Sequence, residues 1–148
     1  MEKFIIKPFK ELSNIEVFEI ARIRTDVFVA EQKITVPEMD DQDITAYHVL
    51  LPNQNNTNAL AYCRFFLDKD NRYYIGRVAT LKEARGQGLA SEMLSQVHSF
   101  LKKNNLTDTV YLHAQKQVIP FYEINGYQKV GQEFMEAGIP HQLMKKKL

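Results

Sequence analysis

Residues 73–103, YYIGRVATLKEARGQGLASEMLSQVHSFLKK, contain the pattern from which the fold follows. The first eight of these residues are mostly apolar or β-branched, which predicts a strand over 73–80. From residue 89 onwards, apolar residues recur at steps of three and four, which predicts a buried stripe on an amphipathic helix over 89–103. The stretch therefore predicts a strand, a glycine-containing turn and a helix.

The turn between this strand and this helix spans residues 85–90, and its sequence RGQGLA suits the binding of a phosphate group. The first backbone N–H groups of a helix lack partners within the helix and carry partial positive charge. Glycines at 86 and 88 have no Cβ atom, so an anion can approach the main chain closely, and an arginine can add a charge-assisted hydrogen bond. We therefore predict a phosphate or pyrophosphate site, with a plain strand-to-helix turn as the alternative. The site would be formed by Arg85, Gly86, Gln87, Gly88, Leu89 and Ala90.

Two common phosphate-binding motifs do not fit this turn. A Walker loop requires a Gly-Lys-Ser/Thr ending, which is absent. A dinucleotide fingerprint requires three glycines in register and an acidic residue after the next strand, whereas this turn has two glycines and the next strand ends in His113-Ala114-Gln115. The remaining pattern, Arg-x-x-Gly-x-Ala, resembles the coenzyme A pyrophosphate loop of the GCN5-related N-acetyltransferases (GNAT).

A second segment, PFYEINGY at residues 120–127, strengthens this resemblance. It is similar to the Phe/Leu-Tyr-x-x-x-Gly-Phe/Tyr segment of the family, in which a helix tyrosine faces the coenzyme sulfur. Further residues resemble the ElaA-like branch of the superfamily. They are Ile23-Arg24-x-x-Val27-Phe28-Val29-x-Glu31-Gln32, the acidic loop that ends in Asp43, His48, His113-Ala114-Gln115, and Phe134-x-Glu136-x-Gly138-Ile139-x-His141-x-x-Met144.

The rest of the sequence predicts an α/β fold. Ser13-Asn14-Ile15-Glu16 is a capping-box pattern that predicts a helix extending to about Val29. The helix between the fourth and fifth strands makes those two strands parallel, and the other pairs are expected to be antiparallel. This order matches the GNAT fold, so we expect one GNAT domain over residues 1–148, with a mixed, mostly antiparallel sheet flanked by helices. The expected strands lie at about 4–7, 46–51, 59–67, 72–80, 109–114, 127–133 and 142–146, and a short helix lies at about 118–125.

Composition argues against several other classes of protein. The 148 residues carry a net charge of +1 with acidic and basic residues interspersed, so we expect no nucleic-acid and no membrane partner. The N-terminus is too short and too charged for a signal peptide, and no apolar run could span a bilayer. The single cysteine, Cys63, excludes an internal disulfide and lies in an apolar strand, so we expect a buried thiol in a cytoplasmic protein. The sequence leaves open whether the chain forms a homodimer.

The resemblance implies an acetyl-CoA-dependent N-acetyltransferase. Acetyl-CoA would be the cosubstrate, no metal ion would be needed, and the acetyl group would pass directly to a primary amine in a ternary complex. The acceptor, a small molecule or a protein lysine or N-terminus, stays unidentified. Two alternatives are a non-catalytic domain that senses acetyl-CoA or CoA, and a nucleotide-phosphate binder that uses the same glycine turn.

Within such an enzyme, the resemblance implies roles for particular residues. Val78, Ala79 and Thr80 would present main-chain groups to the pantetheine arm, and Gln115 would also contact the cofactor. Tyr122 would protonate the departing thiolate, because a phenol with a pKa near 10 stays protonated at neutral pH. An N–H group near Ala79 to Leu81 would stabilise the oxyanion if the fourth strand bulges there. The alternative for Tyr122 is a core tyrosine that packs the short helix.

The general base is less clearly indicated. Many relatives carry a glutamate just before the segment equivalent to 78–80, where this chain has Gly76-Arg77. The candidates are Glu31, His48, His113 and His141, of which we expect His113, at the end of the fifth strand, and then Glu31. A chain of water molecules leading to solvent is the alternative to a side-chain base. Five carboxylates fall between residues 31 and 43. We expect a solvated loop there that rims a site for a cationic acceptor, because the spacing of a calcium loop is absent.

Overall fold

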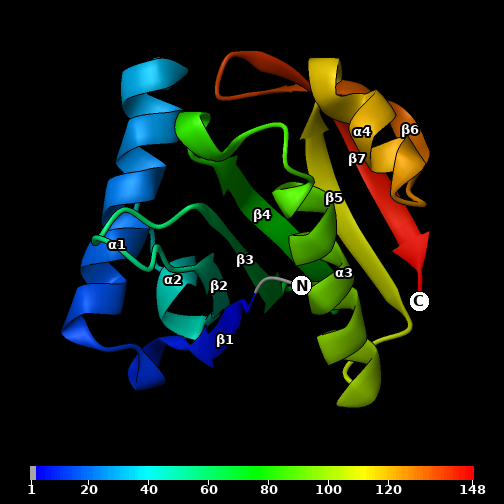
Figure 1. Ribbon diagram of the computed structural model, residues 1–148. Helices are drawn as coiled ribbons and strands as arrows, with labels where there is room; N and C mark the ends of the chain where they lie inside the picture. Colours follow the sequence, from blue (N-terminus) through cyan, green and yellow to red (C-terminus); the bar gives the residue numbers. More distant parts are fainter. Residues whose placement is uncertain (1–2) are drawn as a thin grey trace.

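A computed structural model describes residues 3–148 and confirms the expected α/β fold (Figure 1). One seven-stranded sheet has the order β1-β2-β3-β4-β5-β7-β6, in which only β4 and β5 are parallel. The strands are β1 (Ile5–Pro8), β2 (Tyr47–Leu51), β3 (Ala61–Leu67), β4 (Tyr73–Thr80), β5 (Thr109–Gln115), β6 (Gln128–Glu136) and β7 (Ile139–Lys147). The helices are α1 (Asn14–Arg24), α2 (Gln42–Thr45), α3 (Leu89–Lys103) and α4 (Ile119–Ile124), with short helical segments η1 (Phe9–Glu11), η2 (Thr25–Glu31), η3 (Lys82–Ala84) and η4 (Lys116–Val118).

The first helix begins at the capping box that the sequence predicts. The Ser13 hydroxyl accepts the N–H of Glu16 at 3.0 Å, and the Glu16 carboxylate accepts the N–H of Ser13 at 2.8 Å. The helix continues beyond α1 as the π-helical segment η2, where Gln32 donates its N–H to the carbonyl of Val27 at 3.1 Å. The wider turn lets the helix extend as far as residue 31, close to the predicted end.

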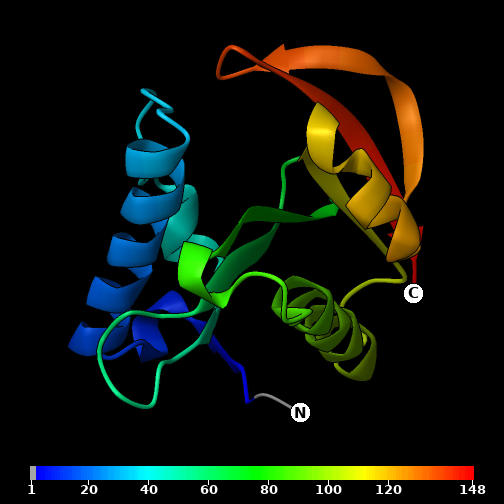
Figure 2. The same ribbon diagram turned by 45° about the horizontal axis from the view of Figure 1, so that its top comes forward.

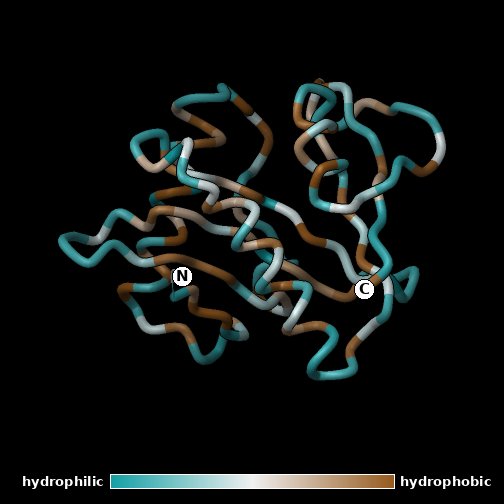
Figure 3. The backbone as a smooth tube through the Cα atoms, turned by 45° about the vertical axis from the view of Figure 1, so that its right-hand side comes forward, coloured by the Kyte–Doolittle hydropathy of each residue, from teal (hydrophilic) through white to brown (hydrophobic). Residues whose placement is uncertain are grey.

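Helices cover both faces of the sheet, but they cover them unequally. On one face, α3 and α4 pack on alternate side chains of β2 to β5 and β7. On the other face, α1 and η2 pack on residues of β2, β3 and β4, so the part of this face formed by β5, β7 and β6 lies beyond α1 (Figure 2). Hydrophobic stretches run along the packed strands and helices, whereas the outer loops are hydrophilic (Figure 3).

The fourth and fifth strands form a fork. They pair only where Tyr73–Ile75 meets Val110–Leu112, and beyond this point they diverge (Figure 1). A β-bulge lies just past the last pair, because the register between β3 and β4 shifts between Tyr62 and Arg64 and Arg77 has a φ of 55°. The bulge therefore lies N-terminal to residues 79–81, the segment in which the sequence analysis considered a bulge.

The hairpin of β6 and β7 closes the far side of the fork. Its tip reaches over the diverging strands toward the end of η2 (Figures 1 and 2). The two last strands are antiparallel, as expected from the sequence, and they pair with each other, which the sequence had left open. Cys63 is fully buried, and burial raises the pKa of its thiol, which confirms the expected inert side chain. Within residues 3–148, no helix is long and apolar enough to cross a membrane.

Candidate active site

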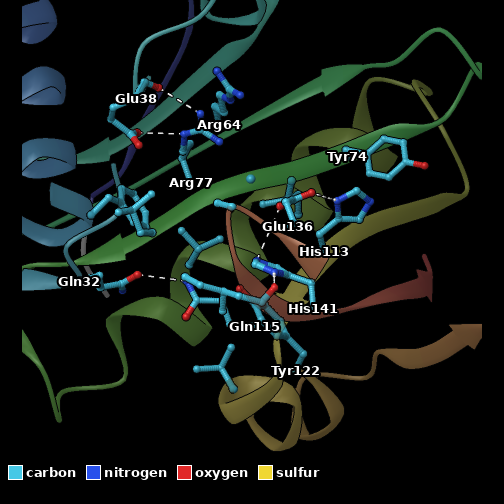
Figure 4. A pocket seen from close by; sticks show the side chains of 18 of the residues that line it. Gln32, Glu38, Arg64, Tyr74, Arg77, His113, Gln115, Tyr122, Glu136 and His141 are labelled. Atoms are coloured by element: carbon cyan, nitrogen blue, oxygen red, sulfur yellow. Dashed lines mark hydrogen bonds and ion pairs between the residues drawn. The ribbon is translucent and has the colours of Figure 1, made fainter. Parts of the chain in front are cut away.

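The fork opens into a cleft of about 680 Å³. Its walls come from β3, β4, β5 and α4, from residues 28–38 and from the tip of the β6–β7 hairpin (Figure 4). Gly76 lies on this wall, and a Cβ atom at that position would meet nothing within 4 Å, so the missing side chain leaves open space. Among the residues predicted from the sequence, those that line the cleft are Val78, Ala90, His113, Gln115, Tyr122 and His141.

The predicted phosphate turn has the geometry of an anion site. Gly86 and Gly88 have φ angles of 81° and 74°, which strongly favour glycine, and a Cβ atom at either position would meet nothing within 4 Å. Within residues 3–148, the backbone N–H groups of residues 86–91 donate to no backbone carbonyl. These donors precede or begin α3, so the helix dipole adds to their attraction for an anion.

Arg85 does not extend freely into this turn. Its Nη1 and Nη2 atoms each donate to the carboxylate of Glu31 at 2.6 Å, and its Nε atom donates to the carbonyl of Thr80 at 3.1 Å. The hydrogen bond from Arg85 lowers the pKa of Glu31, and Glu31 does not line the cleft that contains Tyr122. The structure therefore pairs Glu31 with Arg85, although the sequence analysis gave these two residues separate roles. A carboxylate that is held by an arginine outside the cleft does not suit the role of general base.

The free edge of β4 presents main-chain groups to the fork. Leu81 donates its N–H to the carbonyl of Leu60 at 2.9 Å, which directs this N–H toward the β3 side. Because N–H directions alternate along an antiparallel ladder, the N–H of Ala79 also faces β3, whereas those of Val78 and Thr80 face the fork. The sequence analysis considered the N–H groups of residues 79–81 as donors to the oxyanion. Of these three, the N–H of Thr80 faces the fork. The N–H of Val78 also faces the fork, and the sequence analysis did not consider it for this role.

Tyr122 projects from α4 toward the cleft (Figure 4). Its side chain is packed edge-to-face against Phe121 and Tyr127, with ring centroids 5.1 and 5.7 Å away. Burial raises the pKa of the Tyr122 hydroxyl, so the phenol keeps its proton throughout the neutral range. Within residues 3–148, this hydroxyl has no hydrogen-bond partner, which leaves its proton available to a ligand.

The four histidines separate into two groups. His48 is buried outside the cleft, between the hydroxyl of Tyr62 (2.6 Å) and the carbonyl of Asp43 (2.7 Å), so both of its ring nitrogens are engaged. Burial lowers the pKa of His48, and its role is structural. Burial also lowers the pKa of His98, to about 4, beside Tyr127. The other two, His113 and His141, line the cleft.

The acidic loop is not the solvated rim that we expected from its sequence. Its carboxylates at positions 38, 40 and 43 form ion pairs with three arginines, two of which are buried in the sheet and α1. These ion pairs join Arg24 to Glu38 and Asp43 at 2.7 and 2.6 Å, Arg64 to Asp40 and Asp43 at 2.7 and 2.8 Å, and Arg77 to Glu38 and Asp40 at 2.9 and 3.5 Å. The sequence analysis missed this network because its arginines lie on three different elements. Three positive and three negative charges therefore cancel beside the cleft.

Two carboxylates in the cleft are left outside this network. Within residues 3–148, neither Asp68 nor Glu136 forms an ion pair with a lysine or arginine. Glu136 instead contacts the two cleft histidines, His113 and His141 (Figure 4). The motif that includes Glu136 supported the resemblance, but nothing in the sequence showed that this residue faces His113. Among the same residues, no group of three or more His, Cys, Asp or Glu side chains is placed to hold a metal ion.

A parallel pair of strands that splays beside a bulge, with a glycine turn opening the next helix, defines the acyl-CoA N-acyltransferase fold. The family described as "Acetyltransferase (GNAT) domain" matches residues 23–148, and the chain belongs to this family. The description of this family names its chemistry, which is acetyl transfer.

Individual relatives agree with this assignment. The UPF0039 protein C11D3.02c of Schizosaccharomyces pombe is 32% identical over 147 residues, 99% of this chain and 97% of the relative. The crystal structure of Escherichia coli ElaA superposes with a TM-score of 0.89 at 27% identity, over 99% of this chain and 100% of ElaA. An acyl-CoA N-acyltransferase from Pseudomonas aeruginosa gives 0.88 at 29% identity, over 99% of both chains. The chain is therefore an ElaA-like member of the GNAT superfamily.

Proposed function

We propose that this protein transfers the acetyl group of acetyl-CoA directly to a primary amine in a ternary complex. The observation that carries the proposal is the buried hydroxyl of Tyr122, which faces the cleft without a partner in the described part of the chain. A coenzyme A sensor would need the phosphate turn and the open strand edge, but it would not need a phenol kept protonated at the fork. The residues present therefore fit a catalyst better than a sensor.

Binding and activation of the donor are assigned to two parts of the chain, the turn at residues 86–90 and the free edge of β4. The N–H groups of residues 86–90 hold the pyrophosphate, and the main-chain groups of Val78 and Thr80 pair with the pantetheine arm as a neighbouring strand would. Bound acetyl-CoA supplies the activated acetyl group as a thioester. The N–H of Val78 donates to the carbonyl oxygen as negative charge develops there, an interaction worth about 3 kcal/mol in comparable sites.

Tyr122 and His113 are assigned the two proton transfers. The sulfur of the leaving group gains charge as its bond to the acetyl carbon breaks, and the Tyr122 hydroxyl donates a proton or a hydrogen bond to it. His113 takes a proton from the acceptor amine, which must lose its positive charge before it can attack. Gln115 lines the cleft, where its Nε2 atom donates to the side chain of Gln32 at 3.0 Å, and it is assigned to contact with the cofactor.

The charges of the cleft favour a cationic acceptor that lacks a carboxylate. The arginines beside the cleft are neutralised by the acidic loop, so none is left to bind an anion. Asp68 and Glu136 remain, and an ammonium group is attracted to them. The expectation of a cationic acceptor is thus kept, although the residues responsible differ from the acidic loop that first suggested it.

A panel of amines with acetyl-CoA, monitored by release of free thiol, tests the proposed function. Alkylamines, diamines and lysine peptides are expected to react, whereas amines with a carboxylate beside the amino group are expected to react slowly. Tight binding of acetyl-CoA without turnover of any amine would instead support a sensor. Thermal-shift measurements with ATP and CoA in competition distinguish a nucleotide binder from an acetyltransferase and from a sensor. Only a nucleotide binder is expected to be stabilised more by ATP than by CoA.

The Gly88→Ala variant tests the phosphate turn. Residue 88 has a left-handed backbone that costs alanine about 1–2 kcal/mol, and the new methyl group would lie where the pyrophosphate approaches. We expect the Kd for coenzyme A, measured by calorimetry, to rise about tenfold. Gly131→Ala is the matched control, since Gly131 has a φ of 71° and equal space around its Cβ position but lies on β6. Equal affinities in Gly88→Ala and Gly131→Ala would contradict this assignment.

A further inference from the structure

The tip of the β6–β7 hairpin places a carboxylate between the two histidines of the cleft. Glu136 is the last residue of β6, and its Oε1 atom lies 2.8 Å from Nδ1 of His113. Its Oε2 atom lies 3.7 Å from Nε2 of His141 (Figure 4). Because the hairpin is distant in sequence from β5, only the folded chain brings Glu136 to His113.

The hydrogen bond determines which nitrogen of His113 carries a proton. The bond from His113 lowers the pKa of Glu136, while burial opposes this shift, so Glu136 is an ionised carboxylate that can only accept. Nδ1 of His113 is therefore the protonated donor, and in the neutral form of the imidazole Nε2 is the nitrogen that can accept a proton. Within residues 3–148, Nε2 of His113 has no hydrogen-bond partner.

The surroundings fix the orientation of the His113 ring. Tyr74 of β4 and Phe134 of β6 pack edge-to-face against the ring, with centroids 5.5 and 5.0 Å away. Two other charged or titratable groups face the pair formed by Glu136 and His113. His141 donates from Nδ1 to the carbonyl of Ile139 at 2.8 Å, and Arg77 is neutralised by the acidic loop. Within residues 3–148, no lysine forms an ion pair with Glu136. The carboxylate of Glu136 therefore interacts with the imidazole of His113.

We propose that Glu136 is the positioning residue that prepares His113 to act as the general base, replacing the strand carboxylate that is missing at Gly76. This inference rests on the proposed function. The ammonium proton of the acceptor moves to Nε2 of His113, directly or through one water, which leaves a neutral amine and an imidazolium. The Glu136 carboxylate stabilises that imidazolium across the Nδ1 hydrogen bond, and solvent later removes the proton.

A structural ion pair across two strands is the competing explanation, and the pH dependence of the Glu136→Gln variant separates the two. For an alkylamine acceptor at pH 7, we expect kcat to fall roughly 10- to 100-fold while KM changes little. The loss should shrink as the pH approaches the acceptor's own pKa, because more acceptor then arrives already deprotonated. A peptide N-terminus, with a pKa of about 8, should be affected less than an alkylamine with a pKa of about 10.

Glu133→Gln is the matched control, because Glu133 lies on the same strand, is 45% exposed against 47% for Glu136, and forms an ion pair with Lys116 at 3.4 Å. Glu133→Gln should keep wild-type kcat. Nitrogen-15 NMR of the imidazole should show the Nδ1–H form of His113 in the wild type, with the Nε2–H form gaining population in Glu136→Gln. A pH-independent loss, an equal loss in Glu133→Gln, or an unchanged His113 spectrum would overturn the inference while leaving the acetyltransferase assignment intact. Absence of turnover by the wild type on every amine would instead overturn both.

Discussion

The Tyr122→Phe variant is expected to bind coenzyme A like the wild type and to turn over at least 100-fold more slowly at pH 7. Phenylalanine keeps the shape and the edge-to-face packing of the ring against Phe121 and Tyr127, so only the donor is removed. The departing thiolate, whose conjugate acid has a pKa of about 8.5, would then leave without a proton at neutral pH. Steady-state kinetics across the pH range, with calorimetry for binding, measure the two effects separately.

The loss in Tyr122→Phe should diminish at high pH, where a thiolate leaves more easily without a proton. Tyr127→Phe is a suitable control, because Tyr127 is similarly buried and packs on Tyr122, but its hydroxyl is hydrogen-bonded to Nε2 of His98 at 2.6 Å and does not line the cleft. Tyr127→Phe should lose some stability and keep its kcat. If kcat of Tyr122→Phe equals that of the wild type at every pH, the residue is a packing tyrosine and the assigned role is wrong.

The Asp43→Asn variant is expected to lower the free energy of unfolding by about 3 kcal/mol. Asp43 accepts hydrogen bonds from Arg24 at 2.6 Å and from Arg64 at 2.8 Å, and both arginines are almost completely buried. Asparagine keeps the shape but removes the charge, so two buried guanidinium groups lose the partner they share. Breaking such a pair costs more than its formation gains, because Glu38 beside Arg24 and Asp40 beside Arg64 then compensate the two buried charges only in part.

The same residue predicts how stability depends on pH. Burial alone would raise the pKa of Asp43, but hydrogen bonds from Arg24 and from the N–H of Asp40 lower it from 3.8 to about 2. The folded state therefore binds this proton more weakly than the unfolded state does. The resulting stability, about 2 kcal/mol, is present above pH 4 and is lost as the pH falls through the folded pKa near 2.

Chemical denaturation between pH 2 and pH 7 checks both parts of this prediction. The difference between wild type and Asp43→Asn should be largest above pH 4 and should narrow toward pH 2. Asp41→Asn provides the control, since Asp41 is an exposed neighbour in the same loop and should leave stability unchanged. A difference that stays constant with pH would show that the side-chain contacts of Asp43, and not its charge, stabilise the loop.

Much of the fold could be read from local sequence signals. The capping box at Ser13 and the apolar period over residues 89–103 predicted where α1 begins and where α3 begins and ends. The change of period around a glycine turn predicted the parallel pair of β4 and β5. Strand ends were less certain, by one to three residues, because pairing partners rather than propensity decide where a ladder stops.

The site was predictable only where one short segment supplies it. RGQGLA predicts an anion turn locally, since glycine adopts the left-handed backbone at 86 and 88 without the steric cost that a side chain adds. The role of Glu31 could not be judged in this way, because its pairing with Arg85 joins residues 54 positions apart. The acidic loop likewise looked solvated, because its buried arginine partners come from α1 and β3, which are separate elements of the chain.

The sequence by itself therefore determined the order of the elements, the glycine turn before α3 and the family, since each depends on residues close together in the chain. Only the tertiary structure decided which N–H groups of β4 face the fork, which carboxylates stay unpaired, and that Glu136 meets His113. These features depend on register, on a bulge and on side chains from separate elements. Their electrostatic interactions fall off with distance in space, and distance along the chain does not reveal them.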